Sequence, residues 1–301
     1  MSDRTLVIGW FSFELMGETA GDRIARDVLL GWLRNRGIHA DVAMHRPQRD
    51  GEIATDLIDP RDYDTLIFVC GPIGDGPPLN EFLARFPHAR MFALNVSLLQ
   101  ERSDWDPFER IVERDSSEET NPDMTFAAGP SSVPVIGMIL VGAQGEYPSN
   151  RHDLAEKAFQ ELLHGRDIAV IPIDTRLDVN EHGLTTAAQV ESVISRMDAV
   201  LTTRLHGAAI ALRRHVPAVV IDSVPGGTKV LAQMRKIGWP LAFDVAELDQ
   251  RKLAEALEFA LTPAAKELAA ERAAAAREDL ASVERRFLDA LQGVRAGPRR
   301  R

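Results

Sequence analysis

The chain has 301 residues and a net charge of −10 at pH 7; 45% of its residues are hydrophobic and 27% are charged. This length accommodates two α/β domains, and the composition is that of a globular protein able to bury a core. The acidic balance argues against a nucleic-acid-binding protein, which would present a basic face, and the single cysteine, Cys70, excludes an internal disulfide bond.

In the first part of the chain, short apolar runs alternate with helical patterns, as in parallel-sheet α/β proteins. The pattern predicts a helix over residues 18–36 and strands over residues 5–11, 39–44, 65–70 and 90–96. Residues 107–117 are expected to form a helix, a short strand and a turn. The small, polar segment 129–134, which contains two prolines, is the predicted linker between domains.

The same alternation returns after the linker. Strands are predicted over residues 135–141, 168–173, 199–203 and 218–222, and helices over residues 151–163, 186–196, 207–215 and 228–237. Two late helices are expected from the spacing of leucines near residues 253–261 and 280–291, and they should pack against a domain face.

This order of elements predicts two Rossmann-like domains, residues 1–128 and 129–262, followed by C-terminal helices and a basic tail at residues 263–301. Domains of this type bind their ligands at the carboxyl ends of the strands.

The turn Arg204-Leu205-His206-Gly207 is the strongest candidate site, because it follows a buried strand and opens an apolar helix. Free backbone N–H groups and the helix dipole favour an anion there. Arg204 can hold a phosphate or a carboxylate through two bonds, and His206 titrates near neutrality and can act as an acid or a base. Gly207 would let the backbone approach a ligand closely.

A second glycine-rich turn, Gly226-Gly227-Thr228-Lys229, follows the next predicted strand. In a parallel sheet the two turns would lie side by side and bring Lys229 close to Arg204 and His206. An alternative is that Arg204 pairs with an acidic neighbour while His206 caps the helix. The second basic turn favours an anion-binding site over that alternative.

Residues 202–212, T-T-R-L-H-G-A-A-I-A-L, followed by V-P-A-V-V-I-D and a lysine, resemble the C-terminal signature of polysaccharide pyruvyltransferases. Weaker matches occur in the expected order at residues 17–22, 71–76 and 111–117, with Pro122-Asp123 after the last. In the first of these the asparagine of the family is replaced by Thr19 or Ala20. The resemblance spans roughly residues 5–245.

The resemblance implies two domains that face each other across a cleft, similar to the GT-B arrangement. It also implies transfer of a pyruvyl group from phosphoenolpyruvate, the co-substrate, to a sugar hydroxyl in exopolysaccharide biosynthesis. Arg204 and His206 would then be catalytic, and the donor site would comprise Arg204, Leu205, Gly207, Thr228 and Lys229. The glycan acceptor would bind at Gly21, Asp22, Gly71 and Asp75.

The sequence departs from the family where an arginine commonly follows the first strand of the second domain. Residues 138–144 contain no basic residue, and Arg151 or Arg176 are the candidates to replace it. Two other functions therefore stay open, a GT-B glycosyltransferase with a nucleotide-sugar donor and a non-catalytic, ligand-binding relative.

No further cofactor and no metal are expected, because the eight histidines are scattered and form no His-x-x-x-His pair. No apolar run approaches the roughly 20 residues of a membrane span, and the start of the chain lacks the pattern of a signal peptide. With its single cysteine, the chain is expected to be cytoplasmic.

Overall fold

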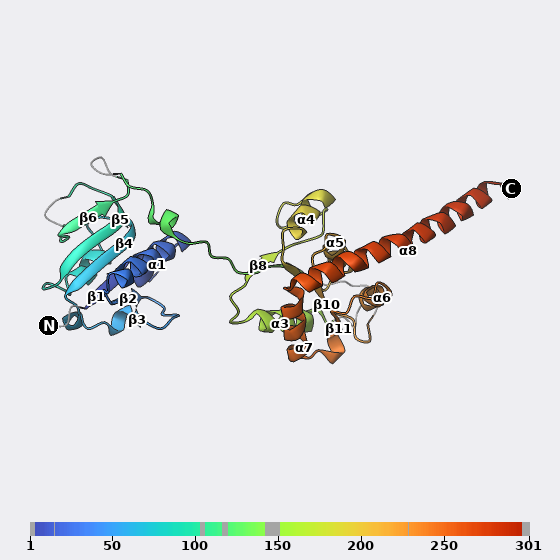
Figure 1. Ribbon diagram of the computed structural model, residues 1–301, viewed down its shortest axis with the longest axis horizontal. Coiled ribbons are helices and arrows are strands. Elements are labelled where there is room, and N and C mark those ends of the chain that lie inside the picture. The colour runs from blue at the N-terminus through green and yellow to red at the C-terminus, as the bar shows by residue number, and fades with distance from the viewer. Residues whose placement is uncertain are drawn as a thin grey trace. The chain divides into compact units, whose positions relative to one another are not determined.

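The computed structural model describes residues 4–14, 16–102, 106–115, 120–141, 151–227 and 229–296. The chain divides into two compact units, Met1–Ser131 (unit 1) and Ser132–Arg301 (unit 2), each with its own sheet (Figure 1). The division falls inside the segment 129–134 that the sequence marks as a linker.

Unit 1 is built on a parallel sheet with the strand order β3-β2-β1-β4-β5-β6. Its strands are β1 (Thr5–Ile8), β2 (Ala40–Met44), β3 (Glu52–Ala54), β4 (Thr65–Ile73), β5 (Arg90–Leu98) and β6 (Arg110–Glu113). Its helices are α1 (Ala20–Asn35) and α2 (Leu79–Leu83), with 3-10 turns at Trp10–Ser12, Thr55–Leu57, Pro60–Asp62 and Met124–Ala127.

Both faces of this sheet are buried, as expected for parallel strands. Helix α1 lies along one face, where Ala25 and Leu29 pack with Val7 of β1 (Figure 1). On the other face, Phe82 and Phe86 join a cluster that includes side chains of β1, β4 and β5. The core of unit 1 therefore consists of two apolar layers with the sheet between them.

Two predictions for unit 1 need correction. The described part of residues 107–117 contains no helix; its regular element is β6, in which Ile111 and Glu113 both turn inward as the strand pairs with β5. The first strand ends at Ile8 rather than at residue 11, and Trp10–Ser12 forms a 3-10 turn.

Unit 2 has a parallel sheet with the strand order β11-β10-β9-β7-β8. Its strands are β7 (Val135–Ile139), β8 (Ala169–Pro172), β9 (Ala199–Thr202), β10 (Ala218–Asp222) and β11 (Ala242–Asp244). Its helices are α3 (His152–Leu163), α4 (Ala187–Ile194), α5 (Leu205–Arg213), α6 (Lys229–Lys236), α7 (Gln250–Ala260) and α8 (Pro263–Ala296), with a 3-10 turn at Val245–Glu247.

Helix α5 begins two residues earlier than its apolar pattern predicts. Arg204 is its N-cap, with extended backbone angles, so His206 lies in the first turn of the helix. Strands β9 and β10 are buried at every residue, and α5 packs on them through Ala208, Ala211 and Leu212. The predicted turn is therefore shorter and more rigid than the sequence indicates.

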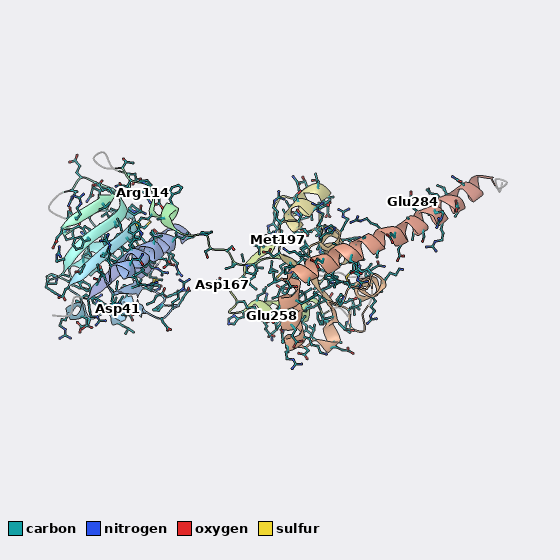
Figure 2. The ribbon with its side chains drawn as sticks, viewed as in Figure 1. Asp41, Arg114, Asp167, Met197, Glu258 and Glu284 are labelled. Carbon is teal, nitrogen blue, oxygen red and sulfur yellow. The ribbon has the colours of Figure 1, made fainter. Side chains whose placement is uncertain are left out.

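The two late helices differ in how they are covered. Helix α7 buries Leu253 and Leu257 in the core of unit 2, and α8 begins with Ala265 and Ala269 buried as well. The second half of α8 extends beyond the rest of unit 2 (Figure 2, at Glu284), and Phe287 there is 65% exposed. The expectation that these helices pack against a domain face holds in unit 2 for α7 and the start of α8.

The prediction of two parallel-sheet α/β domains with helices at the C-terminus is confirmed. That the two domains face each other across a cleft stays a prediction.

Candidate functional site

The candidate site of unit 2 lies where the strand order reverses. From β7 the chain adds β8 on one side of the sheet and then returns to add β9 on the other. At such a point the connections that leave the carboxyl ends of two neighbouring strands run in opposite directions, and the crevice between them can hold a ligand. A cavity of about 200 Å³ occurs at this place, with Val141 after β7 and Thr203 after β9 in its wall.

This cavity brings together most of the predicted donor residues. Arg204, Leu205, His206 and Lys229 all line it. Thr228 lies outside the described residues. The cavity thus joins the two basic turns that follow neighbouring strands β9 and β10, as the sequence predicts.

Arg204 is held in place by its neighbours in the fold. Its side chain is 20% exposed, and Nε donates a hydrogen bond of 2.9 Å to the carbonyl oxygen of Leu140. Its backbone N–H donates to the Oγ1 of Thr202 over 2.9 Å, which fixes the start of α5. The nearest carboxylate that pairs with it, Asp174, lies 3.8 Å away, too far for a hydrogen bond.

Three helices begin at this cavity. His152 is the first residue of α3, Arg204 is the N-cap of α5, and Lys229 is the first residue of α6. Helix N-termini carry a partial positive charge and unsatisfied N–H groups, so their convergence favours an anion. The side chains of Arg204 and Lys229 add full positive charges to that field.

Gly207 has a different role from the one predicted. It does not line the cavity; a Cβ atom there would lie 2.7 Å from the Oγ1 of Thr202 and 2.9 Å from the Cγ2 of Ile139. The glycine therefore lets α5 pack closely on the ends of β9 and β7. We revise its predicted contact with the donor to this packing role.

His152 lines the same cavity and is not among the site residues predicted from the sequence. Both of its ring nitrogens are buried and have no hydrogen-bond partner among the described residues. Burial lowers the pKa of His152; Asp153 acts in the opposite direction, and Arg204 lowers the pKa further. No sequence pattern marks this residue, because only the fold brings the start of α3 beside Arg204.

The two arginines considered as replacements for the missing one lie elsewhere. The Arg151 side chain is exposed, and its backbone N–H donates to the carbonyl oxygen of Ser223 over 2.7 Å. Arg176 forms an ion pair of 2.6 Å with Asp178. Neither lines the cavity in the part of unit 2 that the structure describes.

Unit 1 has its own cavity at its own reversal of strand order. Strands β2 and β3 extend the sheet on one side of β1, and β4 extends it on the other. The cavity, of about 610 Å³, is lined by Trp10 after β1 and by Cys70 near the end of β4. All four predicted acceptor residues, Gly21, Asp22, Gly71 and Asp75, line it too.

Asp22 is 6% exposed and also caps α1. Its Oδ2 accepts hydrogen bonds of 2.8 Å from both the N–H and the hydroxyl of Thr19. The carboxylate of Asp22 therefore both stabilises the start of α1 and lines the cavity. The exposed Asp75 accepts a hydrogen bond from Asn80.

Gly71 permits close packing against Trp10. Its φ of +95° is in the left-handed region, and a Cβ there would lie 2.4 Å from Cδ1 of the Trp10 ring. The indole N–H of Trp10 donates to the carbonyl oxygen of Pro72 over 3.1 Å. Trp10 is thus fixed at the cavity wall with its ring over the strand end.

Left-handed residues also occur within β4 and β5, where the pairing of the two strands skips one residue on each. Cys70 has a φ of +66° and Asn95 a φ of +58°, a strained backbone region for residues with a Cβ. Burial and a hydrogen bond to Asp22 raise the pKa of the Cys70 thiol to about 11. Cys70 is therefore a protonated wall residue rather than a nucleophile.

Arg114 and Asp123 complete this wall, and the predicted acceptor set did not include them. Arg114, which follows β6 (Figure 2), forms an ion pair of 3.1 Å with Asp123 and donates to Ser97 over 2.8 Å. Asn95 donates to Asp123 over 3.1 Å as well. Both residues lie in the weaker matches to the family, at residues 111–117 and at Pro122-Asp123, which could have marked them as site residues. Ser116 and Ser117 lie outside the described residues.

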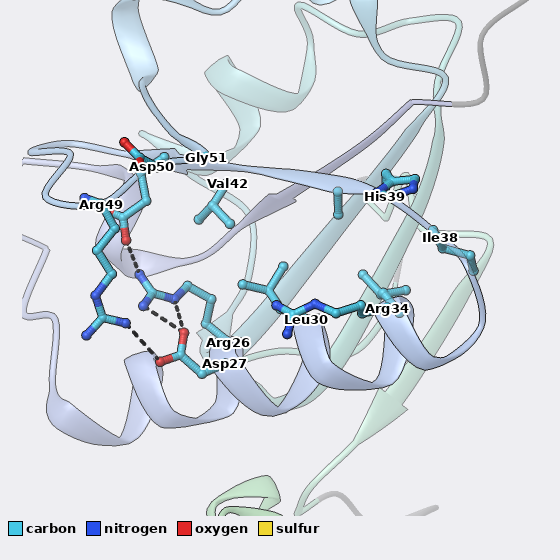
Figure 3. A pocket seen from close by; sticks show the side chains of 13 residues that line it. Arg26, Asp27, Leu30, Arg34, Ile38, His39, Val42, Arg49, Asp50 and Gly51 are labelled. Atoms are coloured by element: carbon cyan, nitrogen blue, oxygen red, sulfur yellow. Dashed lines mark hydrogen bonds and ion pairs between the residues drawn. The ribbon is translucent and has the colours of Figure 1, made fainter. Parts of the chain in front are cut away.

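A further hollow in unit 1, between α1 and the β2–β3 edge, contains mutually paired charges (Figure 3). Arg26 is buried and forms ion pairs with Asp27 at 2.7 Å and Glu52 at 3.0 Å. Arg49 lies 3.5 Å from the other oxygen of Asp27. These contacts tie the helix to the edge of the sheet.

In the ranges that the structure describes, no group of three or more His, Cys, Asp and Glu side chains is arranged to hold a metal ion. Within the same ranges, no helix is both long and apolar enough to cross a bilayer.

Unit 2 thus combines a parallel α/β fold with a basic cavity at its switch point. Residues 119–223 match the family of polysaccharide pyruvyl transferases. This match contains the Arg204–Gly207 turn, confirms the resemblance in that part of the chain, and supports a transferase. The weaker matches at residues 17–22, 71–76 and 111–117 lie outside the matched part. No curated protein matches the chain significantly.

Several solved structures align with the chain over most of its length. They include the glycotransferase of kitacinnamycin (11% identity, 92% of this chain and 95% of that chain, TM-score 0.33) and Acinetobacter baumannii MurG (9%, 92% and 95%, TM-score 0.30). UDP-GlcNAc 2-epimerase from Methanocaldococcus jannaschii also aligns (10%, 86% and 93%, TM-score 0.32). TM-scores this low do not establish a shared fold, so the fold is assigned from the strand order of the two sheets.

Proposed function

We propose that this transferase moves a pyruvyl group from phosphoenolpyruvate to a hydroxyl of a glycan or glycoside. The observation that carries the proposal is the cavity at the β7–β9 switch point, which lies mostly within the segment that matches the family. Arg204 and Lys229 supply positive charge to this cavity, and the N-termini of α3, α5 and α6 converge on it.

The size of the cavity supports a compact donor. At about 200 Å³ it is smaller than the roughly 300–1,000 Å³ of pockets that enclose drug-sized ligands. A three-carbon phosphate ester fits this space better than a nucleotide sugar does. The carboxylate and the phosphate of phosphoenolpyruvate also match two separate cationic side chains.

The residues fit the chemistry of pyruvyl transfer. Protonated His206 would give its proton to the methylene carbon of the donor, which becomes a methyl group. A sugar hydroxyl then bonds to the neighbouring carbon and gives its proton to the now neutral His206. Inorganic phosphate leaves when its C–O bond breaks, and a second hydroxyl bonds to the same carbon, gives its proton to the departing phosphate and closes a cyclic ketal. Arg204 and Lys229 would stabilise the charge on the departing phosphate.

The acceptor is assigned to the cavity of unit 1. Its wall offers the carboxylates of Asp22, Asp75 and Asp123 as hydrogen-bond acceptors for sugar hydroxyls. Trp10 offers an aromatic ring, which can stack on the apolar face of a sugar. Within this proposal Gly21 and Gly71 shape the cavity rather than bind through a side chain.

A direct binding experiment tests the donor. We expect phosphoenolpyruvate to raise the Tm of the full chain in a concentration-dependent way, and Arg204→Ala to abolish this shift. Arg213→Ala is the matched control, since Arg213 lies on the last turn of the same helix and pairs with Glu191 at the surface. A shift produced by nucleotide sugars and not by phosphoenolpyruvate would contradict the proposal.

A further inference from the structure

His152 is the one residue of the donor cavity whose polar atoms are buried without partners among the described residues. Its Nδ1 and Nε2 are both inaccessible to solvent. Buried polar atoms in folded proteins are nearly always hydrogen-bonded, so such a pair needs an explanation. The explanation lies in the position of the ring, which lines the cavity beside Arg204.

The surroundings lower the pKa of His152, which favours the neutral form of the ring. Burial lowers its pKa, Asp153 on the same helix opposes this, and Arg204 at the start of α5 adds to the lowering. The N-terminus of α3, where His152 lies, also disfavours a positive charge on the ring.

Four other titratable groups lie at or near this cavity. His206 from α5 and Lys229 from α6 line the same space. Asp222, at the end of β10, directs its two oxygens to the backbone N–H groups of Val224 and Leu231 over 3.1 Å each. Its charge is thus shared with the turn between β10 and α6. Asp174 lies on the Arg204 side, 3.8 Å from that guanidinium.

We propose that His152 binds the anionic donor directly and takes up a proton from solvent as the donor binds. An anion beside the ring can accept a hydrogen bond from one of its two nitrogens once the ring turns that nitrogen towards the cavity, and it reverses the local electrostatic balance that favours the neutral ring. The inference rests on the proposed function, because it assumes that the cavity binds phosphoenolpyruvate.

His152 then does what the absent arginine would do. A histidine in this place differs from an arginine because it is charged only when the anion is present. Without a bound anion, His152 therefore adds no further positive charge next to Arg204 and Lys229. Donor binding by this chain should in turn be linked to pH through a group on α3.

The test is isothermal titration calorimetry of the full chain with phosphoenolpyruvate, at one pH in two buffers of different ionisation enthalpy. The dependence of the heat on the buffer gives the number of protons taken up. His152→Gln retains hydrogen-bonding groups but cannot gain a charge. His164→Gln, at the exposed C-terminal end of the same helix, is the matched control.

We expect His152→Gln to bind about 10-fold more weakly than the wild type, as for the loss of one charge-assisted hydrogen bond. It should also take up fewer protons, while His164→Gln behaves as the wild type does. The titration of the donor itself is common to all three proteins and cancels in the comparison. Unchanged affinity and proton uptake in His152→Gln would overturn the inference.

A second titration, with inorganic phosphate, separates this inference from the proposed function. If phosphoenolpyruvate fails to bind but phosphate binds with proton uptake that requires His152, the proposed function fails and the role of His152 stands. If neither anion binds, both fail. As a check that does not depend on a variant, the NMR signal of the His152 ring in the wild type should titrate at higher pH with the donor bound than without it.

Discussion

The guanidinium of Arg204 is bonded to the carbonyl oxygen of Leu140, 2.9 Å from its Nε. Leu140 directly follows β7, and Arg204 directly precedes α5, so this bond crosses the switch point of the sheet. It leaves the two terminal nitrogens of Arg204 as the groups that can reach a ligand. The position of these nitrogens is thus set by the backbone of a neighbouring strand rather than by a flexible side chain.

Arg204→Lys should therefore weaken donor binding although it keeps the charge. Lysine has no Nε donor for Leu140 and no planar pair of nitrogens for a phosphate or carboxylate. We expect Kd for phosphoenolpyruvate to rise about 10- to 100-fold, in line with one or more charge-assisted hydrogen bonds. Calorimetry measures the Kd, with Arg213→Lys as the control. Equal Kd values for Arg204→Lys and the wild type would contradict two-bond binding of the donor by Arg204.

His206→Ala should separate binding from turnover. Loss of a general acid lowers kcat by roughly 100- to 10,000-fold, whereas the donor keeps its contacts with Arg204. The measurements are phosphate release with a panel of glycosides and, separately, the Kd of phosphoenolpyruvate. Turnover that survives in His206→Ala would assign the proton transfer to another group.

Gly207→Ala should destabilise unit 2. The added Cβ meets the Oγ1 of Thr202 at 2.7 Å and the Cγ2 of Ile139 at 2.9 Å, so α5 must shift from the sheet. Such overpacking costs about 1–3 kcal/mol. Gly31→Ala in α1 is the matched control, because open space surrounds that position and the change should stabilise the helix by up to ~1 kcal/mol. Urea unfolding measures the free energy of unfolding of both variants. An unchanged value for Gly207→Ala would contradict the close packing of α5 on the sheet.

Asp123 should make part of the stability of unit 1 depend on pH. Burial acts to raise its pKa, but hydrogen bonds from Thr125, Asn95 and Arg114 prevail and lower it from 3.8 to about 2. Because the folded pKa lies below the unfolded one, this contribution is complete above about pH 4 and is lost as the pH falls towards 2.

The measurement is the free energy of unfolding as a function of pH for the wild type and Asp123→Asn. We expect the difference between them to shrink as the pH falls through this window. A constant difference would show that the charge of Asp123 is not what stabilises the native state.

Cys70 should react slowly with alkylating reagents in the native protein. Burial and the contact with Asp22 raise its pKa from 9.0 to about 11, which lowers the thiolate fraction near neutral pH about 100-fold. The rate of iodoacetamide modification at pH 8, followed by mass spectrometry, should rise at least that much in denaturant. A fast native reaction would indicate an accessible thiolate.

The sequence was sufficient to predict that Arg204, His206 and Lys229 lie together in unit 2. In a parallel sheet, a buried strand followed by a polar turn and an apolar helix can place Arg204 and His206 only at the carboxyl end of that strand. The same rule placed Lys229 beside them, since β10 is the neighbour of β9. These residues are close in the chain to the strands that position them, which is why local patterns sufficed.

Other features depend on packing between distant segments and could not be predicted. His152 faces Arg204 because β7 lies next to β9, and nothing near residue 152 indicates that. The contact of Gly207 with Ile139 depends on the same pairing. Strands β3 and β11 have three residues each, too few for an alternating pattern to emerge.

The two units have separate cavities, so the ligand specificity of one unit can change independently of the other. Each cavity is enclosed by residues of one unit alone, so changes in the pocket of unit 1 leave the walls of the pocket in unit 2 intact. A chimera that joins unit 2 to the first domain of a relative would inherit one recognition surface from each parent. Under the proposed function, recombination at the proline-containing segment 129–134 would alter which hydroxyl compound is chosen and leave the donor cavity unchanged.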